Sequence, residues 1–403
     1  MFLCYFCNMN KYMTIILTVV TMLLFPSCDK EKNEPKPQEH SRTVLIYAVA
    51  SNNLSSYLDK DMEEMIEAAP AVKGLGDNVR VLLYSVASKN ASEATIAELS
   101  KNQDGSYEFK TLKSYDRETF STDPKRMSEV YADLRQIAPA DSYGLIFWSH
   151  ATGWLPDFNS HQLPGMQRSF GWDTYENTTD KCDIIELADA IPDRMFDYIW
   201  FDACYMMCVE TVYQLRNKCD YIGGYPTEDW SPGMNYDSTL PLLAAVDPDL
   251  TGAGKVFFDY YNDSNMAVTV SVIATDGLEN LAAVSSEIYS KGSRPESAFG
   301  FQDYGRSPYR GLYDFGQFTR AYLTSNGEVD DKAADNDDLG NVFSNALDRV
   351  LLYGGCTAKD FYGNANAFDP DIYSGMYCHF PDTFSEAQEE YYRRLDWYQA
   401  TKP

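Results

Sequence analysis

Continuous runs of apolar residues recur through the first half of the chain, and segments between them carry apolar residues every three or four positions. The continuous runs are typical of strands buried on both faces, and the spaced positions are typical of amphipathic helices. The apolar runs cover residues 43–50, 79–86, 143–149, 196–201 and 221–223. The helical patterns cover residues 58–69, 124–137, 184–191 and 206–216. This alternation predicts an α/β fold in which a mostly parallel sheet has helices on both faces.

The pattern becomes less regular after residue 240. We predict strands at residues 268–274 and 374–380, and helices at residues 278–289, 312–322, 339–352 and 384–397. A boundary near Asp247 would separate a domain of residues 42–246 from a C-terminal α+β extension or subdomain of residues 247–403. The same pattern allows the second part to pack on the first as an extension of one domain.

The first 41 residues are predicted to be an export signal and a tether. Residues 13–25 are apolar over about the length of a signal-peptide core and are too short to span a membrane. The region up to Cys28, after which the composition becomes charged, resembles a bacterial lipoprotein signal. We expect a signal peptide of residues 1–27, a lipidated Cys28 within a polar tether of residues 28–41, and an outer-membrane lipoprotein of the cell envelope that faces the periplasm or the cell surface. An ordinary cleaved signal with an incidental cysteine is the alternative.

The composition limits the partners of the protein. Its formal charge of −27 opposes binding to nucleic acid or to an anionic membrane surface, and it favours the approach of basic peptides. We expect a monomer that contacts the membrane only through its N-terminal lipid. The six cysteines beyond Cys28 match no zinc spacing, so the sequence predicts no metal and no cofactor. The acidic composition permits calcium binding, although no loop has the EF-hand spacing.

Two residues of possible catalytic chemistry follow successive apolar runs. His150 comes directly after one run, and Cys204 follows the next run after an interval of 54 residues. Catalytic groups in parallel sheets lie beyond the carboxyl ends of the strands, so adjacent strands would bring both side chains to one edge. A histidine about 50 residues before a cysteine is also the order found in caspases. Taken singly, His150 could be a core histidine and Cys204 a buried apolar residue, but the ordered pair favours catalysis.

At these segments the sequence resembles the clostripain family of cysteine peptidases, which belongs to the caspase-like clan CD. Residues 143–154 are similar to the histidine segment of that family, and residues 201–210 are similar to its nucleophile segment. Residues 170–173 and 228–236 resemble further family landmarks, and the similarity extends over residues 42–382. The resemblance implies a caspase-like fold and an endopeptidase that acts on protein or peptide substrates.

The resemblance also implies roles for individual residues. Cys204 would attack the peptide carbonyl as a thiolate favoured by the N-terminus of the following helix, and His150 would activate it and protonate the leaving amine. Backbone N–H groups of Ala151 and Cys204 would form the oxyanion hole. Asp202 takes the position that lines the S1 pocket and favours Arg or Lys at P1. A structural carboxylate at the end of a strand is an equally good interpretation of Asp202.

Two more acidic residues and one basic residue are assigned on the same basis. Asp173 and Glu228 are candidates for the rim of the substrate pocket. Family members often mature by cleavage between the histidine and cysteine segments, and the intervening loop of residues 155–169 contains one basic residue, Arg168. We therefore predict self-cleavage after Arg168. Some relatives need calcium, which the resemblance leaves open here.

The sequence departs from the family pattern at the histidine segment and in the substrate region. Ala151 replaces a glycine, which would distort the oxyanion hole if this position requires a positive φ. Met207, Cys208 and Met234 also replace residues that are smaller or different in the family. A catalytically weakened, caspase-like binding lipoprotein is therefore the alternative function. A hydrolase that acts on amides other than peptide bonds is a third possibility.

Overall fold

The computed structural model describes residues 41–155, 170–297, 300–305, 311–324, 338–365, 367–379 and 385–402. Its centre is a sheet of nine strands, which are β1 (Arg42–Val49), β2 (Val79–Val86), β3 (Ala94–Lys101), β4 (Tyr107–Tyr115), β5 (Ser142–Trp148), β8 (Tyr198–Asp202), β9 (Tyr221–Gly224), β10 (Thr269–Ala274) and β12 (Leu351–Cys356). The order across the sheet is β12-β10-β9-β8-β5-β1-β2-β3-β4.

The five central strands, from β2 to β9, are parallel, and the strands at both edges are antiparallel. Every residue of β1, β5 and β8 is buried, as expected from their continuous apolar sequence. The predicted α/β fold with a mostly parallel sheet is therefore confirmed.

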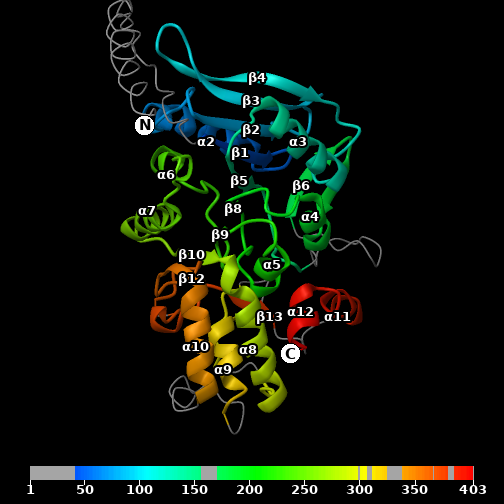
Figure 1. The fold of residues 1–403 in the computed structure, drawn as a ribbon, viewed down its shortest axis with the longest axis vertical. Coiled ribbons are helices and arrows are strands. Elements are labelled where there is room, and N and C mark those ends of the chain that lie inside the picture. The colour runs from blue at the N-terminus through cyan, green and yellow to red at the C-terminus, as the bar shows by residue number, and fades with distance from the viewer. Residues whose placement is uncertain are drawn as a thin grey trace, which may run out of the picture. The chain divides into compact units, whose positions relative to one another are not determined.

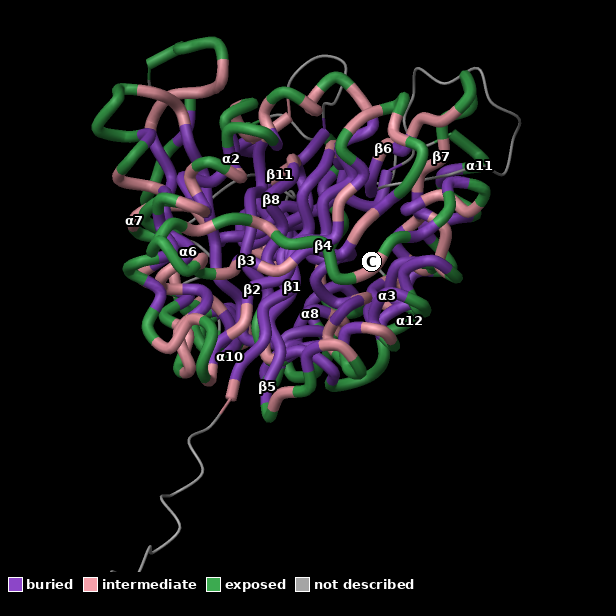
Figure 2. The backbone as a smooth tube through the Cα atoms, turned by 90° about the horizontal axis from the view of Figure 1, so that it is seen from above, coloured by how far each residue is buried: buried purple, intermediate pink, exposed green. Residues whose placement is uncertain are grey.

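Helices cover both faces of the sheet (Figure 1). One apolar core lies between the sheet and the helices α2 (Ser55–Ala68), α6 (Tyr236–Leu243) and α7 (Leu250–Asp263). The second core lies on the other face, under α3 (Pro124–Ile137), α4 (Ile184–Ala190), α5 (Val209–Gln214) and α8 (Leu278–Lys291). Successive residues of β1, Leu45 and Ile46, point into opposite cores because side chains alternate along a strand. Figure 2 shows the buried backbone concentrated in the strands and the exposed backbone on the outer helices and loops.

The part of the chain after residue 246 completes this sheet. Its strand β10 pairs directly with β9, and β12 pairs with β10. The helices α9 (Phe315–Ala321) and α10 (Asp338–Val350) pack beside α8, with the rings of Phe315 and Phe343 in edge contact (Figure 1). The short strands β11 (Leu312–Asp314) and β13 (Tyr377–His379) pair with each other, and α11 (Glu386–Tyr392) and α12 (Asp396–Thr401) end the chain. The C-terminal part thus shares its sheet with the part that carries His150 and Cys204.

A small antiparallel hairpin, β6 (Phe170–Tyr175) and β7 (Thr178–Cys182), lies between the segments of His150 and Cys204. Among the described residues, no helix is long and apolar enough to cross a membrane. The predicted signal peptide, Cys28 and Arg168 lie outside the described residues.

Candidate active site

His150 and Cys204 lie side by side beyond two adjacent strands. The register between β5 and β8 places Trp148 opposite Asp202, so each candidate residue is two positions past a paired residue. Neighbouring strands are about 4.8 Å apart, and their ends here lie at one edge of the sheet. Both residues line a cavity of about 80 Å³, together with Asp202 and Glu228. The structure therefore brings together four of the residues selected from the sequence.

The ring of His150 is held by two neighbours. Its Nε2 lies 2.8 Å from Oδ1 of Asn53, and its ring centroid is 4.5 Å from that of Trp172. Burial, with a smaller contribution from the cation of Lys181, lowers the pKa of His150 to about 4. The imidazole is therefore neutral near pH 7. Because Oδ1 of Asn53 accepts a hydrogen bond, the proton is on Nε2 and Nδ1 can accept a proton.

The sulfur of Cys204 contacts the loop that follows β9. The backbone N–H of Asp229 donates to Sγ over 3.3 Å. After Cys204 the chain continues along this loop, because the N–H of Tyr205 donates to the carbonyl of Thr227 and the N–H of Met207 donates to that of Tyr225. The donor beside the sulfur is therefore a backbone amide of the neighbouring loop.

This arrangement corrects the predicted start of the following helix. The expected helix of residues 206–216 is α5, which begins only at Val209, with Cys208 at its N-cap. The backbone of residues 205–207 is engaged with residues 225–227 and does not enter the helix. The helix consequently begins five residues after Cys204 rather than two, and the expectation that it favours the thiolate stays a prediction.

Asp202 lies at the floor of the cavity and is 5% exposed. Its carboxylate accepts hydrogen bonds from the Tyr236 hydroxyl over 2.9 Å and from the backbone N–H of Met234 over 3.2 Å. A carboxylate that lines a pocket and also accepts structural hydrogen bonds combines features of both interpretations made from the sequence.

A second carboxyl group, of Asp229, is hydrogen-bonded to Asp202. Burial raises the pKa of Asp202 to about 6, and burial together with the charge of Asp202 raises the pKa of Asp229 well above its usual range. The directions of the two shifts favour a singly ionised pair, with its proton on Asp229 and its negative charge on Asp202. Asp61 adds no charge near pH 7, because burial and the nearby charge of Asp202 raise its pKa to about 9.

The sequence prediction missed Asp229. The signal that would have found it is the pair Glu228-Asp229, which begins four residues after the end of β9, at the same edge of the sheet as Cys204. Glu228 was selected from that pair and does line the cavity. Its Oε2 lies 3.5 Å from the hydroxyl of Tyr205.

The Pro232-Gly233 pair in the segment of residues 228–236 forms a turn that requires glycine at position 233. The φ of Gly233 is 69°, and a Cβ at this position would lie 3.1 Å from Oδ1 of Asp202. The Tyr261 hydroxyl donates to the carbonyl of Gly233 over 2.6 Å and fixes the turn. Glycine is favoured here because the backbone passes close to the pocket carboxylate in the left-handed region.

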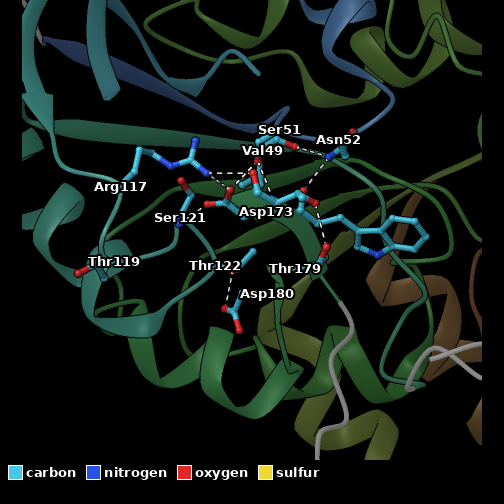
Figure 3. A network of polar contacts seen from close by, with 12 residues as sticks. Val49, Ser51, Asn52, Arg117, Thr119, Ser121, Thr122, Asp173, Thr179 and Asp180 are labelled. Carbon is cyan, nitrogen blue, oxygen red and sulfur yellow. Dashed lines mark hydrogen bonds and ion pairs between the residues drawn. The ribbon is translucent and has the colours of Figure 1, made fainter. Parts of the chain in front are cut away.

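Asp173 does not reach the cavity, which corrects its predicted place on the pocket rim. Its side chain is fully buried, does not line the cavity and lies in a polar network (Figure 3). It accepts hydrogen bonds from the Ser51 hydroxyl and the Arg117 guanidinium, each over 2.5 Å, and from the backbone N–H of Ser121 over 2.6 Å. Residues alternate along β6, so Trp172 and Asp173 face opposite sides, and only Trp172 turns toward His150.

The same network connects the loop after β1 to β6 (Figure 3), and further hydrogen bonds connect both to Ser149, which precedes His150. The side-chain amide of Asn52 donates to the carbonyls of Val49 and Trp172, over 3.0 Å and 2.8 Å. The hydroxyl of Ser149 donates to the carbonyl of Val49 and accepts from the N–H of Trp172. These bonds hold Trp172 in the position where its ring contacts His150.

Ala151 replaces a glycine of the family pattern, but its φ is not positive. Positive φ occurs instead at Gly153, with a φ of 67°. A Cβ on Gly153 would lie 2.3 Å from the Tyr377 hydroxyl and 2.9 Å from the carbonyl oxygen of Tyr205. The backbone next to His150 therefore accommodates alanine without strain of this kind.

The remaining cysteines supply no disulfide or metal site within the described part of the chain. Its six cysteines are free thiols, and it contains no group of three or more His, Cys, Asp or Glu residues arranged to hold a metal ion. Cys208 is fully buried, its thiol donates to the Thr211 hydroxyl over 3.0 Å, and burial raises its pKa to about 12. Cys204, by contrast, lines an open cavity.

Comparison with known proteins agrees with this architecture. The chain is 26% identical over 249 residues to clostripain of Hathewaya histolytica, a match that covers 55% of this chain and 46% of that relative. It thus spans under half the length of clostripain. A secreted C11 cysteine protease from Bacteroides thetaiotaomicron, solved with an irreversible peptide inhibitor, is 27% identical with a TM-score of 0.74, over 90% of this chain and 98% of that one.

An inactive zymogen C11 protease from Parabacteroides distasonis is also 27% identical, with a TM-score of 0.73 over 90% of this chain and 98% of the other. The sequence model of the clostripain family matches residues 46–402. That match covers most of the chain, including His150 and Cys204. The chain therefore belongs to the clostripain family of cysteine peptidases.

Proposed function

We propose that the protein is a cysteine endopeptidase that cleaves peptide bonds after Arg or Lys by means of a Cys204–His150 dyad. The observation that carries this proposal is a single cavity that is lined by the thiol, a neutral imidazole and a buried carboxylate. A thiol and a base supply the chemistry of amide cleavage, and the carboxylate supplies a reason for a basic P1 residue.

The steps follow from the protonation states. Nδ1 of neutral His150 takes the proton of the Cys204 thiol, and the thiolate attacks the carbonyl carbon of the P1 residue. The N–H groups of Ala151 and Cys204 donate to the oxyanion. The imidazolium returns its proton to the leaving amine, and water then hydrolyses the thioester with His150 again acting as the base. Asn53 keeps the proton on Nε2 and so keeps Nδ1 available.

The P1 preference follows from the charge of the pocket. The pKa shifts favour a negative charge on Asp202 and a proton on Asp229, and Asp61, with a pKa of about 9, is protonated near neutral pH. A guanidinium or ammonium group would form a charge-assisted hydrogen bond with the carboxylate of Asp202, which is 5% exposed. Glu228 on the rim adds to the attraction.

We further propose the maturation and location of the enzyme. Cleavage after Arg168 would separate the segment of His150 from the segment of Cys204, and it uses the same preference for a basic P1 residue. The proposal of a lipid on Cys28 rests on the apolar segment before it and the polar tether after it, and it would place the enzyme on the cell envelope. The substrates would be extracellular or periplasmic proteins and peptides.

The test is hydrolysis of fluorogenic peptides that differ only at P1, with the chain from residue 41 onward, which belongs to one compact unit. Cleavage after Arg or Lys that is lost in Cys204→Ala supports the proposal, and Cys182→Ala is the matched control for loss of a buried thiol. Cleavage after neutral residues would remove the basic pocket from the proposal. A lack of cleavage by both uncut and Arg168-cut protein would favour the binding lipoprotein.

A further inference from the structure

A second and larger cavity, of about 400 Å³, lies beside the cavity of Cys204. Glu228 lines both cavities, and Tyr205, which directly follows Cys204, lines the second. The other walls come from the C-terminal part of the chain, with lining residues in the segments 267–268, 301–305, 360–364 and 367–368. If a peptide is bound at Cys204, the side chain of a residue near the scissile bond could therefore reach this second cavity.

The walls of the second cavity suit a cation. Aromatic rings line it, including those of Phe301, Tyr304 and Phe361. Among its described lining residues the charged ones are all acidic: Glu228, Asp303 and Asp360. A cation is attracted to the faces of aromatic rings and to carboxylates, so the methylene stem and charged head of Arg or Lys match both kinds of wall.

Two of these carboxylates are fixed in place by backbone amides. Oδ1 of Asp303 accepts from the N–H groups of Gly305 and Leu312, and Oδ1 of Asp360 accepts from those of Tyr362 and Asn364. Neither aspartate forms an ion pair with a Lys or Arg within the part of the chain that the structure describes.

The position of the second cavity relative to Cys204 indicates which residues of a bound substrate would enter it. His150 follows β5 and returns a proton to the leaving amine, so the residues after the scissile bond would leave on the β5 side of Cys204. The second cavity is on the other side, where Thr227 follows β9 and Val268 precedes β10. Residues before the scissile bond would pass over it.

We propose that this cavity is a second substrate subsite, which binds an Arg or Lys side chain two to four residues before the scissile bond. Preferred substrates therefore carry two basic residues, one at P1 and one upstream. This inference rests on the proposed function, because it takes the direction of the substrate from the Cys204–His150 dyad.

The test uses peptides with Lys at P1 and either Arg or Gln at P2, P3 or P4 in turn. At one of these positions Arg should raise kcat/KM about tenfold over Gln, which is the size expected for a partly buried cation between rings and carboxylates. The ratio should fall toward one in Asp360→Asn and in Tyr362→Leu, a change to a ring that is 57% exposed and outside the core. The control Asp259→Asn alters an exposed pair on α7 and should keep the full ratio.

The outcomes separate the two proposals. Cleavage of the P1 Lys peptides with equal rates for Arg and Gln at all three positions would overturn the second subsite and keep the peptidase. If no peptide is cleaved, the binding of the same peptides to Cys204→Ala is measured by fluorescence anisotropy. A preference for Arg that Asp360→Asn removes would then support the subsite without the peptidase, and equal binding would overturn the subsite as well.

Discussion

The backbone N–H of Asp229 donates to Sγ of Cys204 over 3.3 Å, and the side chain of the same Asp229 is hydrogen-bonded to Asp202. One residue of the loop after β9 thus contacts both the proposed nucleophile and the carboxylate at the floor of the cavity. If the carbonyl carbon of the P1 residue lies at Cys204, the side chain of that residue would lie next to Asp202. In the proposed mechanism, Asp202 therefore contacts the side chain of the residue whose peptide bond is cleaved.

Replacement of Asp202 and of Asp229 by asparagine should affect catalysis to different extents. Asp202→Asn should lower kcat/KM for an Arg P1 substrate about 100-fold, because it removes the charge that pairs with the guanidinium. Asp229→Asn should lower it less than about fivefold, because that carboxyl group is already protonated. Steady-state kinetics of both variants checks this, and equal losses would show that the negative charge is not on Asp202.

The pH profile should report the same carboxylate. As pH falls through about 6, Asp202 takes up a proton and loses its charge, so kcat/KM for an Arg P1 substrate should fall on the acid side. His150 does not cause this loss, because its pKa of about 4 leaves it neutral at pH 6. In Asp202→Asn the acid limb should move to lower pH. An acid limb that stays near pH 6 in this variant would assign it to another group.

Asn53 should act on catalysis through the orientation of His150. Asn53→Ala removes the acceptor that keeps the proton on Nε2, so kcat should fall about 10- to 100-fold while KM changes little. Asn53 is exposed, so the free energy of unfolding should change by less than about 0.5 kcal/mol. Asn53→Gln, which keeps an amide oxygen, should retain more of kcat than Asn53→Ala. A rise in KM without a fall in kcat would place Asn53 in substrate binding instead.

The buried pair of Arg117 and Asp173 should matter for stability. Asp173→Ala should lower the free energy of unfolding by about 3–5 kcal/mol, because it leaves the guanidinium buried without its partner charge. The double variant Arg117→Met, Asp173→Ala should recover part of that loss. Denaturation by urea measures both, and Asp259→Ala, at an exposed ion pair, should cost less than about 1 kcal/mol. A single variant as stable as the native chain would contradict the role given to the network.

The sequence was sufficient to predict the sheet and the place of the two catalytic candidates. β5 and β8 are continuous apolar runs, and His150 and Cys204 follow them directly, so strand adjacency alone brings the two residues together. That reasoning needs only local patterns and the rule that sites lie at the carboxyl ends of parallel strands.

The loops could not be predicted in the same way. Asp173 follows a tryptophan that does reach His150, but the direction of each side chain depends on the packing of β6 against Ser51 and Arg117, which are distant in sequence. The carboxyl pair of Asp202 and Asp229 depends on a loop held by Tyr261 from α7. Local patterns carry no information on such long-range contacts.

The most direct test of the central claim is covalent labelling with a peptide chloromethyl ketone that has Lys at P1, followed by mass spectrometry of the digested protein. We predict one adduct per chain, on Cys204, with labelling strongly reduced in His150→Ala. Absence of an adduct on Cys204, or labelling of Cys204 no faster than that of the other free thiols, would contradict the assignment of Cys204 as the nucleophile of a peptidase.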